Sequence, residues 1–271
     1  MSPDVGTRIW KRLRNMPSKY PTNALIPYLT YGDPTAEFTE ALIDTCFENG
    51  ADAIEIGVPF SDPIADGPVI QASHQRALIA NPKITLPEVL ALVSRVKRKH
   101  KKPVILMAAA NLIFHFGIQA FFIFAKEASL DGIVIPDLTV EEATPYSQAG
   151  KAAGVDVCLL ISPQCSVARM PHIVDNTQGF LYLMAAAGTT GTRETMDENL
   201  AAFMQAIQKR RDIPVYVGFG ISRPEHVQSV LGYADGAIVG SHLVKVIEAH
   251  LGDLDAAQNA LGMAIRKLKG H

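Results

Sequence analysis

Short apolar runs alternate with longer segments of helical periodicity along most of the chain. Aliphatic and β-branched residues fill the runs 24–30 and 53–57, while the segment between them, 35–49, has apolar residues at helical spacing and stops at Gly50. This order predicts a strand, a helix and a second strand, a unit in which the strands are parallel and the crossover is right-handed. The pattern then repeats toward the C-terminus.

Six further apolar runs predict strands, and helical patterns lie between and after them. The predicted strands span 104–107, 132–137, 155–161, 180–184, 215–218 and 236–239. The predicted helices span 69–80, 87–101, 119–129, 140–153, 167–176, 200–210, 224–231, 242–250 and 254–269, with a short additional helix at 4–14.

Strands that are this uniformly apolar are typical of parallel sheets covered on both faces. Eight strands alternating with helices favour a closed barrel over an open doubly wound sheet. The first strand is not followed by the GxGxxG sequence of a dinucleotide-binding fold. The sequence therefore predicts an α/β fold: one (β/α)8 TIM-barrel domain over residues 1–271, with an extra N-terminal helix and an insertion after the second strand.

Composition narrows the classes of function. The chain has 271 residues, 48% of them hydrophobic, and a net charge of −2, which allows a large core and argues against a nucleic-acid-binding surface. No window approaches the ~20 consecutive apolar residues that span a bilayer. The three cysteines lack CxxC spacing, which argues against a disulfide framework or a zinc site and suits a reducing cytoplasm.

The second predicted strand carries a carboxylate. Side chains alternate along a strand, so Glu55 points to the opposite face from Ile54 and Ile56, into an interior where an unpaired charge is costly. The proline-rich segment that follows holds a second acid, Asp66, and can carry it toward Glu55. This arrangement predicts an acid–base pair. The alternative is a structural carboxylate satisfied by a neighbouring group, with the loop acids capping turns.

Glycine-rich loops follow the sixth, seventh and eighth predicted strands. They are 188–191, 218–222 and 240–241, and the last one opens a helix. Glycine lets backbone N–H groups approach an anion, and a helix N-terminus adds positive potential. No lysine or arginine lies in these loops, so we expect a phosphate held mainly by backbone amides. The alternative is that the glycines only turn the chain.

The whole block from Ile54 to Pro68, IEIGVPFSDPIADGP, resembles the signature of the tryptophan synthase α subunit family, and the resemblance extends from about residue 23 to 245. It implies retro-aldol cleavage of indole-3-glycerol phosphate to indole and glyceraldehyde 3-phosphate, without a metal or a cofactor in this chain. It also implies a cytoplasmic protein that passes indole to a pyridoxal-phosphate β subunit in an α2β2 complex.

The resemblance implies roles for individual residues. Glu55 matches the general acid–base of the family, and Asp66 matches the carboxylate that accepts a hydrogen bond from the indole N–H. Positions that match substrate-binding residues are Tyr28, Tyr182, Thr190, Gly191, Gly220, Gly240 and Ser241.

Several positions depart from the family pattern. Ala109 stands where a tyrosine is common, and the alanines at 185–187 replace residues that usually carry hydroxyl groups. Such changes weaken the support of a site while leaving its carboxylates in place. They motivate a second hypothesis, a subunit that stimulates its β partner while cleaving poorly. A third is another phosphate-binding barrel enzyme, such as an isomerase or a prenyl-glyceryl-phosphate synthase.

Overall fold

The computed structural model describes residues 20–184, 198–218 and 220–270 of the chain. The helix predicted at 4–14 lies outside the described residues. None of the described helices is long and apolar enough to cross a membrane.

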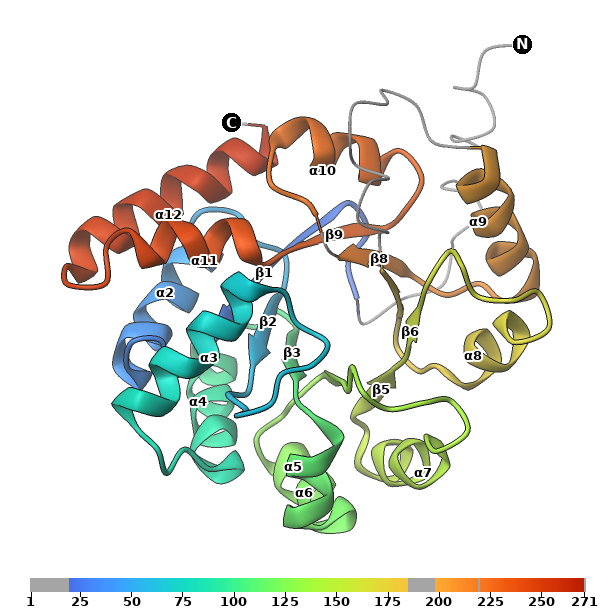
Figure 1. Ribbon diagram of the computed structural model, residues 1–271, viewed down its shortest axis with the longest axis horizontal. Helices are drawn as coiled ribbons and strands as arrows, with labels where there is room; N and C mark the ends of the chain where they lie inside the picture. Colours follow the sequence, from blue (N-terminus) through green and yellow to red (C-terminus); the bar gives the residue numbers. More distant parts are fainter. Residues whose placement is uncertain (1–19, 185–197, 219, 271) are drawn as a thin grey trace.

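The strands form one parallel sheet that curls into a barrel (Figure 1), as the sequence predicted. Each strand pairs with its neighbours in the order β5-β4-β3-β2-β1-β9-β8-β7-β6. The strand bounds are β1 Ala24–Thr30, β2 Ile54–Gly57, β3 Val104–Met107, β4 Gly132–Val134, β5 Asp156–Cys158, β6 Leu160–Ile161, β7 Leu181–Met184, β8 Val215–Gly218 and β9 Gly236–Val239.

The run predicted as a single strand at 155–161 is divided in the structure. Its first half, β5, pairs with β4, whereas its second half, β6, pairs with β7, and Leu159 lies between them. The two ends of the sheet order are therefore consecutive in the chain. Eight predicted strands become nine segments because one strand changes partner, and the barrel closes through this point.

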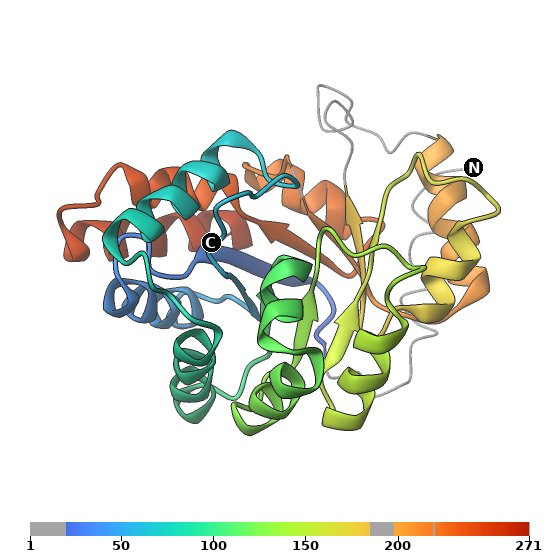
Figure 2. The ribbon, with the colours of Figure 1, turned by 60° about the horizontal axis from the view of Figure 1, so that its bottom comes forward.

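The helices surround the strands (Figures 1 and 2). Their bounds are α2 Ala36–Glu48, α3 Pro68–Ala80, α4 Leu86–Lys99, α5 Ala110–Phe116, α6 Ile118–Glu127, α7 Thr144–Ala153, α8 Met170–Asn176, α9 Glu198–Arg210, α10 Pro224–Leu231, α11 Ser241–Glu248 and α12 Leu254–Lys269. Both α3 and α4 follow β2, which confirms the predicted insertion. Helix α5 was not predicted, because its seven residues are too few to show a helical period.

Alternation along each strand divides the core into two layers. Ile54 and Ile56 belong to the large cluster between strands and helices, whereas Ala53 belongs to a separate cluster inside the barrel. In β1 the same rule sends Leu29 outward and Tyr28 inward. Glu55 shares the inward face with Ala53, so the fold itself places a carboxylate inside the barrel.

An arginine fixes α3 against the two neighbouring segments. Arg76 donates from Nε and Nη2 to the two carboxylate oxygens of Asp33, at 2.9 and 2.8 Å, and from Nη1 to Glu248 at 2.7 Å. Asp33 follows β1, and Glu248 ends α11. This bidentate pair positions α3, and with it the loop that carries Asp66, over the end of β1.

Close packing on the inward face of β2 depends on a glycine. A Cβ atom at Gly57 would lie 1.9 Å from the hydroxyl oxygen of Tyr28, whereas nothing lies within 4 Å of a Cβ at Gly252. We predict that Gly57→Ala destabilises the protein by about 1–3 kcal/mol, the usual cost of overpacking, and that Gly252→Ala changes stability by less than about 0.5 kcal/mol. Urea unfolding of both variants tests this. Equal midpoints for Gly57→Ala and the parent would contradict the packing described.

Candidate active site

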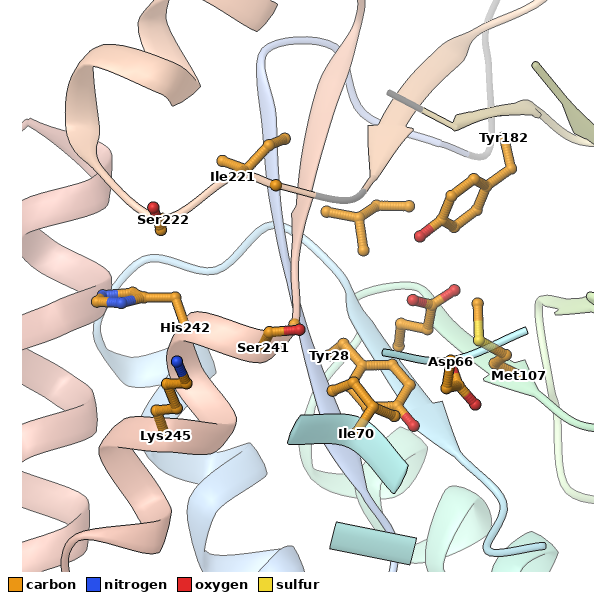
Figure 3. A pocket seen from close by; sticks show the side chains of 14 residues that line it. Tyr28, Asp66, Ile70, Met107, Tyr182, Ile221, Ser222, Ser241, His242 and Lys245 are labelled. Atoms are coloured by element: carbon orange, nitrogen blue, oxygen red, sulfur yellow. The ribbon is translucent and has the colours of Figure 1, made fainter. Parts of the chain in front are cut away.

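A cavity of about 300 Å³ opens at the carboxyl ends of the strands. Figure 3 shows it from close by. Its lining joins acidic, aromatic, apolar and glycine positions from six strands or the segments that follow them, together with α3 and α11. These residues are Tyr28, Glu55, Asp66, Ile70, Met107, Tyr182, Gly220, Ile221, Ser222, Ile238, Gly240, Ser241, His242 and Lys245.

Glu55 is the deepest ionisable group of this cavity. Its side chain is 1% exposed, and neither carboxyl oxygen has a hydrogen-bond partner among the described residues. Burial, reinforced by the nearby Asp66, raises the pKa of Glu55 to about 8. Glu55 is therefore protonated at neutral pH and can act as an acid.

Asp66 approaches the cavity from the loop between β2 and α3. Its backbone N–H donates to Pro63 O at 3.1 Å, and its carbonyl oxygen accepts from Gln71 Nε2 at 2.8 Å. The side chain is 13% exposed, and burial raises its pKa to about 6. Asp66 is thus mostly ionised at neutral pH while Glu55 holds its proton.

Two tyrosines stand beside this acid pair. Tyr28 is the direct register partner of Glu55 on the neighbouring strand, and Tyr182 comes from β7. Burial raises the pKa of both phenols, with Asp66 as the second cause for Tyr28 and Glu55 for Tyr182. A Cβ at Gly218 would lie 2.0 Å from the Tyr182 hydroxyl, so this ring, like that of Tyr28, rests over a glycine.

The opposite end of the cavity combines backbone and hydroxyl groups. Gly240 and Ser241 lie at the start of α11, and Gly220 follows β8 with a φ of 73°, a conformation that favours glycine. Ser222 and Ser241 lie on this side of the cavity in Figure 3, away from Asp66 and Met107. The structure therefore brings together these three predicted phosphate positions.

Lys245, a basic residue on α11 that was not predicted as a site residue, lines this end of the cavity together with His242. Lys245 lies four residues after Ser241 on α11, so the two share one helix face. The sequence signal for Lys245 was this spacing from a predicted ligand.

Two predicted site residues, Thr190 and Gly191, lie outside the described residues, as do the alanines at 185–187. Ala109 is described and precedes α5, whose first N–H, that of Ala110, donates to Asp137 Oδ1 at 2.8 Å.

The fold and the cavity define a class of protein. It is a (β/α)8 barrel with a buried carboxyl pair at one end of its cavity and a glycine-rich, cationic end suited to an anion, as expected for a barrel enzyme acting on a phosphorylated substrate.

Comparison with known proteins shows which family the chain belongs to. The sequence model of the family described as tryptophan synthase alpha chain matches residues 16–270. The chain is 43% identical to the tryptophan synthase alpha chain of Geotalea daltonii over 87% of its own length and 88% of the relative's, and 41% identical to that of a Geobacillus strain over 84% and 86%. A structure from the Pyrococcus furiosus tryptophan synthase α2β2 complex superposes with a TM-score of 0.84 at 37% identity, covering 93% of this chain and 100% of the other. A structure of the Pyrococcus furiosus tryptophan synthase α subunit gives a TM-score of 0.83 at 36% identity, with the same coverage.

This chain belongs to the tryptophan synthase alpha chain family. It is a lyase of tryptophan biosynthesis that cleaves indole-3-glycerol phosphate and works with a β subunit.

The raised pKa of Glu55 has a consequence for stability. The folded-state value, about 8, exceeds the ordinary value of 4.5, so the contribution of Glu55 to folding is fully present below pH 4.5 and is lost as the pH rises toward 8. We predict that Glu55→Gln, which cannot ionise, becomes more stable than the parent by a few kcal/mol between about pH 5 and 8. Urea unfolding of both proteins across this range measures the difference. A difference that stays constant with pH would contradict the assignment.

Proposed function

We propose that Glu55 and Asp66 divide the acid–base chemistry of indole-3-glycerol phosphate cleavage between them. The observation that carries this proposal is that both carboxyl groups line one cavity, with Glu55 fully buried and without a hydrogen-bond partner among the described residues and Asp66 13% exposed, so that the pKa of Glu55 is raised further than that of Asp66. Two carboxyl groups whose environments separate their pKa values can serve as acid and anion at the same pH. One fold thereby offers a proton donor and a negative charge within one cavity.

In this proposal the carboxyl group of Glu55 gives its proton to C3 of the indole ring. The ring then carries positive charge, and the Asp66 carboxylate stabilises that charge by accepting a hydrogen bond from the indole N–H. Glu55, now ionised, takes the proton of the glycerol hydroxyl as the carbon–carbon bond breaks and the bonding electrons return to the ring. The products are indole and glyceraldehyde 3-phosphate, and Glu55 is protonated again.

The phosphate group occupies the other end of the cavity in this assignment. Backbone N–H groups near Gly220 and Gly240, the hydroxyl of Ser241 and the N-terminus of α11 suit a phosphate, and the Lys245 ammonium adds a positive charge. Thr190 and Gly191 stay predicted contacts from the loop after β7. The indole ring would then lie toward Met107 and the two tyrosines.

The assignments of cofactor and domain follow from the same family. We propose that the cleavage needs no cofactor in this chain and that pyridoxal phosphate belongs to the β subunit. That residues 1–271 form one barrel domain stays a prediction.

Steady-state conversion of indole-3-glycerol phosphate to indole, by the chain alone and with a β subunit, tests this function. We predict that Glu55→Gln lowers kcat by at least about 10²-fold, since it retains the shape of the side chain but has no proton to transfer. Near-parental turnover by Glu55→Gln would remove Glu55 from the mechanism. A parent chain that makes no indole in either state while it stimulates the β subunit would be a regulatory subunit instead.

The phosphate end is tested by a graded series at Gly240. A Cβ there meets only ordinary contacts, 3.5 Å to Tyr28 Cβ and 3.7 Å to Ile70 Cδ1, so the fold accepts alanine. We predict that Gly240→Val raises KM by at least about tenfold with Gly240→Ala in between, because the added carbons hinder close approach of the phosphate to the backbone. An unchanged KM in the valine variant would refute this phosphate site.

A further inference from the structure

His74, on α3, is buried beside the acid pair and has a defined tautomer. Its Nδ1 accepts a hydrogen bond from the backbone N–H of Phe60 at 3.0 Å, so the ring proton of the neutral imidazole is on Nε2. Burial lowers the pKa of His74 to about 4, which keeps the ring neutral. These two properties hold the ring in one orientation and one protonation state.

The Nε2–H of His74 is directed at the active site. Nε2 lies 3.1 Å from the Tyr28 hydroxyl oxygen and 3.9 Å from Asp66 Oδ2. Because His74 has only this proton to give, Tyr28 is the acceptor of the 3.1 Å hydrogen bond. The phenolic proton of Tyr28 must then point elsewhere.

The neighbouring hydroxyl groups are already engaged. Ser73 Oγ donates to Ile70 O at 2.7 Å, so in its 2.6 Å contact with Thr30 Oγ1 the threonine is the donor. The remaining contact, between Thr30 Oγ1 and the Tyr28 hydroxyl, is long at 3.4 Å. Thr30 Oγ1 is therefore only a weak acceptor for the phenolic proton of Tyr28, which can turn instead into the cavity, where its register partner Glu55 has no hydrogen-bond partner among the described residues.

We propose that His74 is a positioning residue that holds the Tyr28 hydroxyl so that its proton can be donated to the Glu55 carboxylate when that group ionises during cleavage. This inference rests on the proposed function and names a new role within the same site. A buried carboxylate without a donor is costly, and one hydrogen bond to a charged group is strong. Tyr28 therefore supplies the partner that Glu55 needs only in its charged state, which lowers the barrier rather than strengthening substrate binding.

Replacing Tyr28 and His74 tests this role directly. Tyr28→Phe removes one oxygen and keeps the ring over Gly57. His74→Asn places an oxygen near the position of Nδ1, so it keeps the bond from Phe60 N–H but loses the donor to Tyr28. His74→Gln places an amide N–H near the position of Nε2, so it keeps the donor and loses the bond to Phe60.

We expect Tyr28→Phe and His74→Asn each to lower kcat for indole-3-glycerol phosphate cleavage by at least about tenfold, with KM changed less than threefold. His74→Gln should retain most of the activity. The double variant Tyr28→Phe/His74→Asn should be no slower than the slower single variant, because both changes remove one interaction. The assays use the full chain with its β subunit, and unfolding midpoints of each variant confirm folding.

Three results would overturn the inference. They are an unchanged kcat in Tyr28→Phe, losses that multiply in the double variant, and a His74→Gln variant slower than His74→Asn, which would show that the Phe60 contact is what matters. Tyr28→Phe decides the question even if a histidine variant fails to fold. Absence of indole production by the parent chain would instead reject the proposed function.

Discussion

The Glu55 carboxyl group lies inside a closed barrel without a hydrogen-bond partner among the described residues, and the rest of the site is arranged around this constraint. A buried carboxyl group avoids the cost of desolvating a charge by holding its proton. In the proposed mechanism, that same proton is the one given to the indole ring. Burial, reinforced by the nearby Asp66, thus gives Glu55 a preference for the acid form, whereas Asp66, which is less buried, keeps its charge at neutral pH.

Two glycines make room for two tyrosine rings inside the barrel. The rings of Tyr28 and Tyr182 each lie where a Cβ at Gly57 or Gly218 would be. Rings confined in this way cannot turn their hydroxyl groups far from the acid pair. The strand register fixes the position of each ring relative to the glycine that it faces. The two tyrosine hydroxyl groups of the cavity are therefore positioned by strands of the barrel and not by a loop.

The sequence predicted the features that depend on periodicity. Alternation on β2 was enough to place Glu55 inside the barrel, and the stiff segment after it was enough to bring Asp66 to the same end. The change of partner at Leu159 could not be predicted, since a continuous apolar run carries no sign of where its pairing switches. Lys245 and His74 were missed as contributors to the site because they lie on helices, where only the packed structure shows which face meets the cavity.

Ala109, which stands where the family pattern predicts a tyrosine, lies outside the elements that position the acid pair. It lies, with Ala108 and Asp137, beside a small space of about 30 Å³ that Tyr28, His74 and Asp66 also line. Removing a large side chain here takes nothing from the barrel interior, since Met107 is the last inward residue of β3. The positions of both carboxyl groups therefore depend on β2, α3 and the Arg76–Asp33 pair, none of which contains Ala109. An alanine at this position changes the wall of the cavity and leaves its acid–base pair in place.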